Sequence, residues 1–146
     1  MSNRRLVLLS SVSSDAHTWN LVYLQLLIEE MGHRVVNIGA CVPDRLLVEH
    51  AVREKPDLIV LSTVNGHGYG DGKRVIGVLR GEDALRATPV VIGGKLGVAG
   101  PLTAEQVDEL RTAGFDAVFG DDAGRDDLRR FIGELVPTSP GGELVT

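Results

Sequence analysis

The sequence predicts a doubly wound α/β domain built on a five-stranded parallel sheet, and two observations support this prediction. Short apolar runs rich in Val, Ile and Leu alternate with segments of helical periodicity, which is typical of a parallel sheet covered by helices on both faces. The chain of 146 residues is long enough to bury one continuous core. It is too short to hold a (β/α)₈ barrel of about 250 residues in addition.

The apolar runs place the strands, and the periodic segments between them place the helices. The expected strands cover residues 6–10, 35–38, 58–62, 90–92 and 117–119. The expected helices cover approximately residues 20–31, 44–54, 72–85, 103–112 and 124–135. Asp44 and Thr103 are of the types that cap helix N-termini, and Gly32 and Gly114 stand where a glycine can end a helix in the left-handed conformation.

The strand order 2-1-3-4-5, the flavodoxin-like variant of the Rossmann-like folds, is the expected topology for a domain of this size. Open sheets of this kind bind ligands beyond the carboxyl ends of the strands, at the point where the strand order reverses. The loop after Ser10 is therefore the first place to expect a site. We expect residues 1–136 to form the domain and residues 137–146, which contain Pro and Gly without periodicity, to form a flexible tail.

Composition argues against several classes of protein. A formal net charge of −5 and a pI of about 5.3 disfavour nonspecific binding to nucleic acid phosphates. No apolar run approaches the roughly 20 residues that span a bilayer, and the N-terminal run is too short for a signal peptide. Cys41 is the single cysteine and cannot form an internal disulfide. A cytoplasmic protein without nucleic acid or membrane partners is expected.

Asp15 and His17 lie two residues apart in the loop after the first expected strand. In extended backbone such residues project to the same side, so the Asp15 carboxylate can bind one ring nitrogen of His17 and leave the other free for a metal. The competing interpretation, a solvated loop with a capping aspartate, is the one that the residue types alone favour. The position of the loop at the expected switch point favours the metal site.

Two further loops are expected at neighbouring strand ends. Ser62 ends the third strand and is followed by a glycine-rich segment that includes Gly66 and Gly68, and Gly93 and Gly94 follow the fourth strand. Glycines at such positions can form strained turns, or they can leave room for a ligand or another backbone. Three suitable loops at adjacent strand ends favour a shared ligand site.

These segments carry a resemblance to a known family. The family pattern is Asp-x-His-x-x-Gly, then Ser-x-Leu, then Gly-Gly. The corresponding segments here are Asp15-Ala16-His17-Thr18-Trp19-Asn20, Ser62-Thr63-Val64 and Gly93-Gly94. The chain resembles the cobalamin-binding domain family over nearly its whole length, and within it the small subunits of glutamate mutase. Asn20 replaces the glycine of the first motif, and Val64 replaces the leucine of the second.

The resemblance implies a corrinoid cofactor, adenosylcobalamin, whose lower base leaves cobalt and is replaced by His17. Asp15 would then orient His17, Ser62 would donate a hydrogen bond to the displaced base, and the Gly93-Gly94 pair would leave space for the nucleotide tail. The residues implied to contact the cofactor are Asp15, Ala16, His17, Thr18, Trp19, Asn20, Ser62, Thr63, Val64, Gly66, Gly68, Gly93, Gly94 and Lys95.

The sequence also predicts where Trp19 and the histidines other than His17 lie. Trp19 could pack in the core or form a wall against the corrin, and an aromatic side chain near a helix start favours the core. The other histidines, His33, His50 and His67, have no partner at a distinctive spacing and are expected at the surface or in loops.

The function implied by the resemblance is that of the cofactor-binding small subunit of an adenosylcobalamin-dependent carbon-skeleton mutase. The reaction would be the conversion of L-glutamate to 3-methylaspartate, and a separate large barrel-type subunit would supply the substrate site. The chain alone would then be inactive. Two alternatives stay open: a corrinoid carrier for methyl transfer, and a noncatalytic corrinoid-binding module in which Asn20 marks an altered site.

Overall fold

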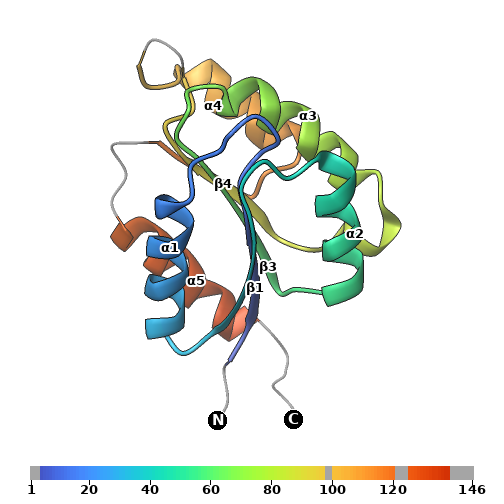
Figure 1. Ribbon diagram of the computed structural model, residues 1–146, viewed down its shortest axis with the longest axis vertical. Coiled ribbons are helices and arrows are strands. Elements are labelled where there is room, and N and C mark those ends of the chain that lie inside the picture. The colour runs from blue at the N-terminus through green and yellow to red at the C-terminus, as the bar shows by residue number, and fades with distance from the viewer. Residues whose placement is uncertain (1–3, 98–99, 121–124, 139–146) are drawn as a thin grey trace.

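The computed structural model describes residues 4–97, 100–120 and 125–138 and shows a five-stranded, wholly parallel sheet in the order β2-β1-β3-β4-β5 (Figure 1). The strands are β1 (Leu6–Ser10), β2 (Arg34–Gly39), β3 (Leu58–Thr63), β4 (Val90–Gly94) and β5 (Ala117–Phe119). The helices are α1 (Trp19–Glu30), α2 (Asp44–Glu54), α3 (Gly68–Arg80), α4 (Ala104–Ala113) and α5 (Arg125–Thr138), with a short 3₁₀ helix, η1 (Asp83–Leu85). The predicted fold class and strand order are confirmed.

Helices cover both faces of the sheet, with α1 and α5 on one face and α2, α3 and α4 on the other (Figure 1). Alternate residues of the central strands supply the two halves of the core. Leu9 and Val60 face α1 and α5, whereas Leu8 and Leu61 face the other three helices. Burial on both faces explains why these strands read as continuous apolar runs rather than as an alternating pattern.

The helix ends agree in part with the sequence signals. Thr103 caps α4 with a full capping box, and Gly32 (φ +96°) and Gly114 (φ +138°) have the predicted positive φ after α1 and α4. Asp44 is not the N-cap residue but the first residue of α2, after Pro43. The expected tail begins inside α5, which extends to Thr138, and its remaining residues lie outside the described part of the chain.

Helix α3 differs most from its prediction, since it begins at Gly68 rather than at residue 72 and ends at Arg80. The early start depends on close packing. A Cβ atom at Gly68 would lie 2.7 Å from the Thr63 methyl group and 2.5 Å from the Leu96 side chain, and one at Gly72 would lie 2.7 Å from the Ile92 side chain. These glycines therefore let α3 approach the sheet, a role that the glycine-rich sequence does not distinguish from a loop.

His33 lies in the connection between α1 and β2, as expected of a loop histidine, but it is buried rather than exposed. Its side chain is 7% exposed, and its Nδ1 accepts a hydrogen bond from the backbone N–H of Arg5 at 2.9 Å. Burial, followed by the positive charge of Arg5, lowers the pKa of His33. His67 is exposed, as expected, and His50 lies on α2 beside Arg53.

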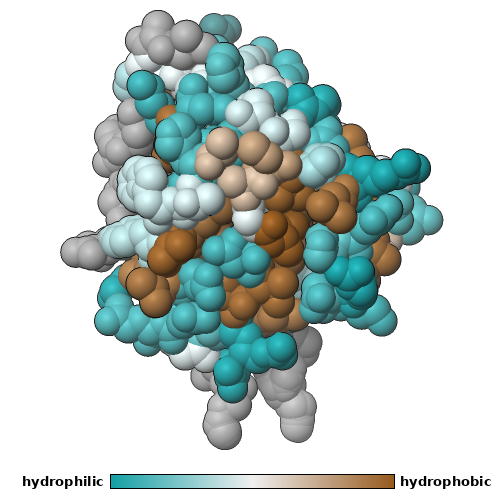
Figure 2. Space-filling view, viewed as in Figure 1, coloured by the Kyte–Doolittle hydropathy of each residue, from teal (hydrophilic) through white to brown (hydrophobic). Residues whose placement is uncertain are grey.

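The solvent-facing side of α1 is unusually apolar. Four of its side chains are large, hydrophobic and exposed: Trp19, Val22, Tyr23 and Leu26. Figure 2 shows further apolar surface in the middle of the viewed face, between α1 and α2, surrounded by hydrophilic residues. Among the described helices, none combines the length and the hydropathy needed to cross a membrane.

Candidate functional site

Asp15 and His17 are held together in the loop between β1 and α1, at the carboxyl end of the central strand. The Asp15 side chain is fully buried, and its Oδ1 accepts hydrogen bonds from His17 Nδ1 at 2.7 Å and from the His17 backbone N–H at 2.9 Å. Because an ionised carboxylate can only accept, Nδ1 carries the proton in this pair. In the neutral ring Nε2 is then the unprotonated nitrogen, and the His17 side chain is half exposed.

The second oxygen of Asp15 ties the same loop to the neighbouring strand. Oδ2 accepts from the Thr63 hydroxyl at 2.6 Å and from the Val64 backbone N–H at 2.8 Å, both at the end of β3. Burial by itself raises the pKa of Asp15, but the hydrogen bonds from Thr63, His17 and Val64 outweigh it and lower the pKa from 3.8 to about 2. The carboxylate is therefore ionised at neutral pH.

Further bonds brace this loop from other elements. The Cys41 backbone N–H, in the connection from β2 to α2, donates to the Asp15 carbonyl oxygen at 2.8 Å. The Ser14 hydroxyl donates to Asp71 of α3 at 2.5 Å, and Arg74 joins Asp71 and Asp44 at 2.9 and 2.7 Å. The loop that presents His17 is thus fixed to β3, to α3 and to the connection before α2.

His17 is the candidate metal ligand, and it stands alone in that role. The described residues contain no group of three or more His, Cys, Asp or Glu side chains that could hold a metal ion by themselves. A metal bound at Nε2 must bring most of its other ligands with it, as a metal in a macrocycle does. The arrangement of buried carboxylate, ring N–H and free Nε2 is the outer-sphere support that metal-binding histidines commonly have.

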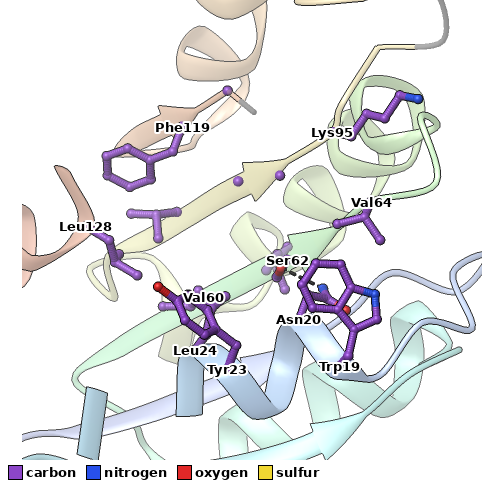
Figure 3. Close-up of a pocket in the computed structure, with 15 residues that line it drawn as sticks. Trp19, Asn20, Tyr23, Leu24, Val60, Ser62, Val64, Lys95, Phe119 and Leu128 are labelled. Carbon is purple, nitrogen blue, oxygen red and sulfur yellow. Dashed lines mark hydrogen bonds between the residues drawn. The ribbon is translucent and has the colours of Figure 1, made fainter. Parts of the chain in front are cut away.

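A pocket of about 440 Å³ opens beside this loop, between α1 and α5 and over the carboxyl halves of β3, β4 and β5. Figure 3 shows Trp19, Asn20, Tyr23 and Leu24 along α1, with Phe119 and Leu128 on the opposite side. The residues that line it are Trp19, Asn20, Tyr23, Leu24, Val60, Leu61, Ser62, Val64, Val91, Gly93, Gly94, Lys95, Phe119, Gly120 and Leu128. Its largely apolar wall suits a flat organic group.

The structure brings Asn20 and Ser62 together in this pocket. Asn20 is the second residue of α1 and only 5% exposed, and its Nδ2 donates to the Ser62 hydroxyl oxygen at 2.8 Å (Figure 3). The carboxamide oxygen of Asn20 is buried and has no hydrogen-bond partner among the described residues. Asn20 does not have a positive φ, so helical backbone accommodates it without the freedom of glycine.

Gly93 and Gly94 line the pocket at the end of β4, where two other backbones come close. Gly94 has φ +113°, and a Cβ atom there would lie 2.1 Å from the Thr63 carbonyl oxygen, which no side chain can tolerate. A Cβ atom at Gly93 would lie 3.3 Å from Phe119. The glycine pair therefore serves strand packing directly, and it also keeps this wall of the pocket free of side chains.

The remaining predicted site residues fall in different places. Val64 and Lys95 line the pocket, whereas Thr63 is buried and does not line it, and Ala16 and Thr18 are exposed in the β1–α1 loop. Gly66 is a turn residue with φ +87° whose N–H donates to the Lys95 carbonyl oxygen at 3.1 Å. Gly68 packs inside α3, and neither glycine lines this pocket.

Trp19 is a correction, because it is not a core residue. Its side chain is 64% exposed and forms part of the pocket wall. Helix α1 begins at Trp19, beyond the carboxyl end of β1, so its first residue lies past the core. Eight lining residues were not predicted from the sequence: Tyr23, Leu24, Val60, Leu61, Val91, Phe119, Gly120 and Leu128. Leu24 follows Asn20 by one helical turn, a spacing that could have indicated a shared face.

The fold and the site together define a doubly wound domain that presents one carboxylate-supported imidazole at the switch point beside a mainly apolar pocket. A family model described as a B12 binding domain matches residues 5–127, and the chain belongs to this family. Several glutamate mutase sigma subunits match the chain. Sigma subunit 2 of Haloarcula marismortui is 30% identical over 115 residues, which cover 79% of this chain and 76% of that protein.

Two further similarities broaden the comparison. The HTH-type transcriptional repressor CarA of Myxococcus xanthus is 36% identical over 90 residues, which cover 60% of this chain and 30% of that protein. The crystal structure of a cobalamin-binding protein from Desulfitobacterium hafniense matches with a TM-score of 0.68 at 22% identity, covering 88% of this chain and 59% of that one. The second similarity supports the fold.

Proposed function

We propose that this protein is the cofactor-binding subunit of an adenosylcobalamin-dependent carbon-skeleton mutase of the glutamate mutase type. The observation that carries the proposal is the Asp15–His17 pair, in which a buried carboxylate holds Nδ1 at 2.7 Å and leaves Nε2 available. The similarity to glutamate mutase sigma subunits supports this choice of reaction, the conversion of L-glutamate to 3-methylaspartate.

The residues present fit a corrinoid. A single imidazole from the protein, that of His17, would suit a cobalt ion whose other ligands come mainly from the corrinoid itself. The pocket of about 440 Å³ next to this histidine could accept the nucleotide tail, with apolar side chains against the base and Lys95 near the opening. Asn20 and Val64, the two departures from the family motif, both line the pocket, which stays open with these side chains in place.

The chain's own part in the reaction would be binding, orientation and control of one proton. His17 would bind cobalt through Nε2, and Asp15 would keep the proton on Nδ1 and hold the ring in place. Thr63 and Val64 would keep the carboxylate ionised. When bound, adenosylcobalamin would supply the radical chemistry of the reaction.

The proposal includes a separate large subunit of barrel type that carries the substrate site. The five strands and helices of the Rossmann-like domain account for the described residues, and a (β/α)₈ barrel alone needs about 250 residues. A cofactor held by His17 in the β1–α1 loop would need a second protein surface to exclude solvent from its radical chemistry. That surface would meet the loops at the carboxyl ends of β1, β3 and β4.

A regulatory corrinoid-binding module is the second candidate. The similarity to a transcriptional repressor, at 36% identity over 90 residues, favours it as the noncatalytic alternative. Both candidates would use the same cofactor site. The mutase subunit would need a partner that carries the substrate site, whereas the regulatory module would not. Turnover in the presence of a large subunit would therefore favour the mutase.

A corrinoid titration tests the site itself. Adenosylcobalamin added to the purified chain should shift to the absorbance spectrum of the base-off, histidine-ligated form. His17→Ala should remove this ligation while leaving the fold intact, because the side chain is half exposed. His67→Ala, which changes an exposed histidine at the same edge of the sheet, is the matched control and should bind like the unaltered chain. Unchanged cobalt ligation in His17→Ala would contradict the proposal.

A further inference from the structure

The pocket between α1 and α5 has apolar walls and one polar corner. Its sides are formed by apolar residues that include Leu24, Val60, Val91 and Leu128. Among the buried residues that line it, the polar side chains are those of Asn20 and Ser62, which lie together where α1 faces β3 (Figure 3). Apolar walls accept many flat aromatic rings of similar size. Discrimination between rings therefore depends on these two side chains.

The hydrogen bonds of this corner leave the Ser62 hydroxyl hydrogen and the Asn20 carboxamide oxygen without partners among the described residues. Asn20 Nδ2 donates to Ser62 Oγ at 2.8 Å, so the hydroxyl hydrogen of Ser62 is still available to a ligand. The Asn20 Oδ1 atom is buried and makes no hydrogen bond with the described residues. A buried acceptor without a partner costs free energy, and a ligand that brings an N–H to it recovers that cost.

We infer that Asn20 and Ser62 select the base at the end of the corrinoid's nucleotide tail, and that they favour an aminopurine such as adenine over dimethylbenzimidazole. An aminopurine offers ring-nitrogen acceptors and an exocyclic N–H donor, which match the Ser62 hydroxyl and the Asn20 oxygen. Dimethylbenzimidazole offers a ring-nitrogen acceptor but no N–H donor, so it leaves Asn20 Oδ1 unpaired. This inference rests on the proposed function, in which the pocket holds the tail.

Asn20 would therefore be a specificity-determining residue rather than a degraded motif position. A glycine at position 20, the residue of the family pattern, would provide no side-chain acceptor and no basis for this choice. The amide also requires little backbone adjustment, because it lies in the first turn of α1 with helical geometry. The substitution of Gly by Asn thus adds a second polar side chain, beside Ser62, at this corner of a mainly apolar pocket.

Binding measurements with three corrinoids test the inference: cobalamin, its adenine-tailed analogue and cobinamide, which lacks the nucleotide tail, each in the aquo form. Calorimetric titration of the unaltered chain should show about tenfold tighter binding of the adenine-tailed form than of cobalamin, the size expected for one unpaired buried oxygen. Asn20→Gly should reduce that ratio to about one. Asn20→Ala should do the same and keeps the helix propensity of the first turn.

Two controls locate the effect in the tail pocket. Gln25→Ala removes another amide from α1, one that bonds Asn37 and Glu29 outside the pocket, and should preserve the preference. Ser62→Ala should weaken binding of both tailed corrinoids and leave cobinamide unaffected.

The outcomes also separate the inference from the proposed function. Equal binding of the two tailed forms, or a preference that survives both substitutions of Asn20, would overturn the inference and leave the proposed function standing. Failure of all three corrinoids to bind would overturn both.

Discussion

One oxygen of Asp15 holds His17 at two points, the ring Nδ1 at 2.7 Å and the backbone N–H at 2.9 Å. The two bonds fix the orientation of the ring relative to its own backbone. Because the other oxygen is bonded to Thr63 and Val64, the orientation is also fixed relative to β3. His17 is thus positioned by the sheet, although it lies in a loop.

Asp15→Asn should weaken cobalt ligation by about 10 to 100-fold. Asp15 accepts from donors at both oxygens, and an amide must place an NH₂ group at one of these positions, where it cannot accept. A corrinoid titration followed by absorbance measures the loss. Asp71→Asn is the control, since Asp71 bonds Ser14 of the same loop but does not contact His17. Equal losses in the two variants would mean that loop stability, not the carboxylate on His17, governs ligation.

The stability of the fold should depend on the ionisation of Asp15 in acid. Its pKa is about 2 in the folded chain against 3.8 for an unperturbed carboxyl, so its contribution of about 2 kcal/mol is present above pH 4. That contribution declines as the pH falls from about 4 to 2. Urea unfolding at a series of pH values, compared with Asp15→Asn, should show a smaller loss for the variant across this interval. Parallel pH curves would refute the assignment.

Gly94→Ala should destabilise the chain by several kcal/mol or prevent folding. The added methyl group would collide with the Thr63 carbonyl oxygen, and the residue has φ +113°. Gly70→Ala, in an exposed position of α3 with open space around it, should instead stabilise the chain by up to about 1 kcal/mol. Thermal unfolding of both variants gives the comparison. Similar melting temperatures for the two variants would show that β4 can move away from β3 at little cost.

The chain alone should give no mutase turnover. Turnover should appear when a cognate large subunit is added. The test mixes the chain, adenosylcobalamin and L-glutamate with and without the large subunit and measures 3-methylaspartate. Cofactor and partner should bind with positive coupling, because the corrin would form part of their contact surface. Turnover by the chain alone would refute the prediction, and binding of the cofactor without turnover in the complete mixture would favour the regulatory candidate.

The sheet and the pairing of Asp15 with His17 were predictable because local sequence determines both. Continuous apolar runs mark strands buried on both faces, and the spacing of Asp15 and His17 needs only one loop to bring them together. The start of α3 at Gly68 was not predictable from the sequence pattern. A glycine is needed there because a Cβ atom would collide with the side chains of Thr63 and Leu96, which lie outside the helix. The spacing of glycines along the sequence does not reveal which of them contact another strand or loop.

Two features of the site depend on contacts that no local pattern contains. Thr63 donates to Asp15 across 48 positions of sequence, and Asn20 bonds Ser62 across 42. The family motif includes Thr63 only as a variable position, so its hydroxyl has no signal in the pattern. The prediction that Trp19 packs in the core was wrong. An aromatic residue near a helix start usually packs inward, whereas here the helix begins beyond the carboxyl end of β1 and Trp19 is exposed.

The position of Trp19 provides a natural optical reporter. It is the sole tryptophan of the chain, and its indole forms part of the pocket wall two residues after His17. Corrins absorb in the near-ultraviolet range where indole emits, so occupancy of the site should quench the intrinsic fluorescence by energy transfer. Uptake and release of a corrinoid could then be followed in real time without a label. A signal from this residue would come from the wall of the pocket itself.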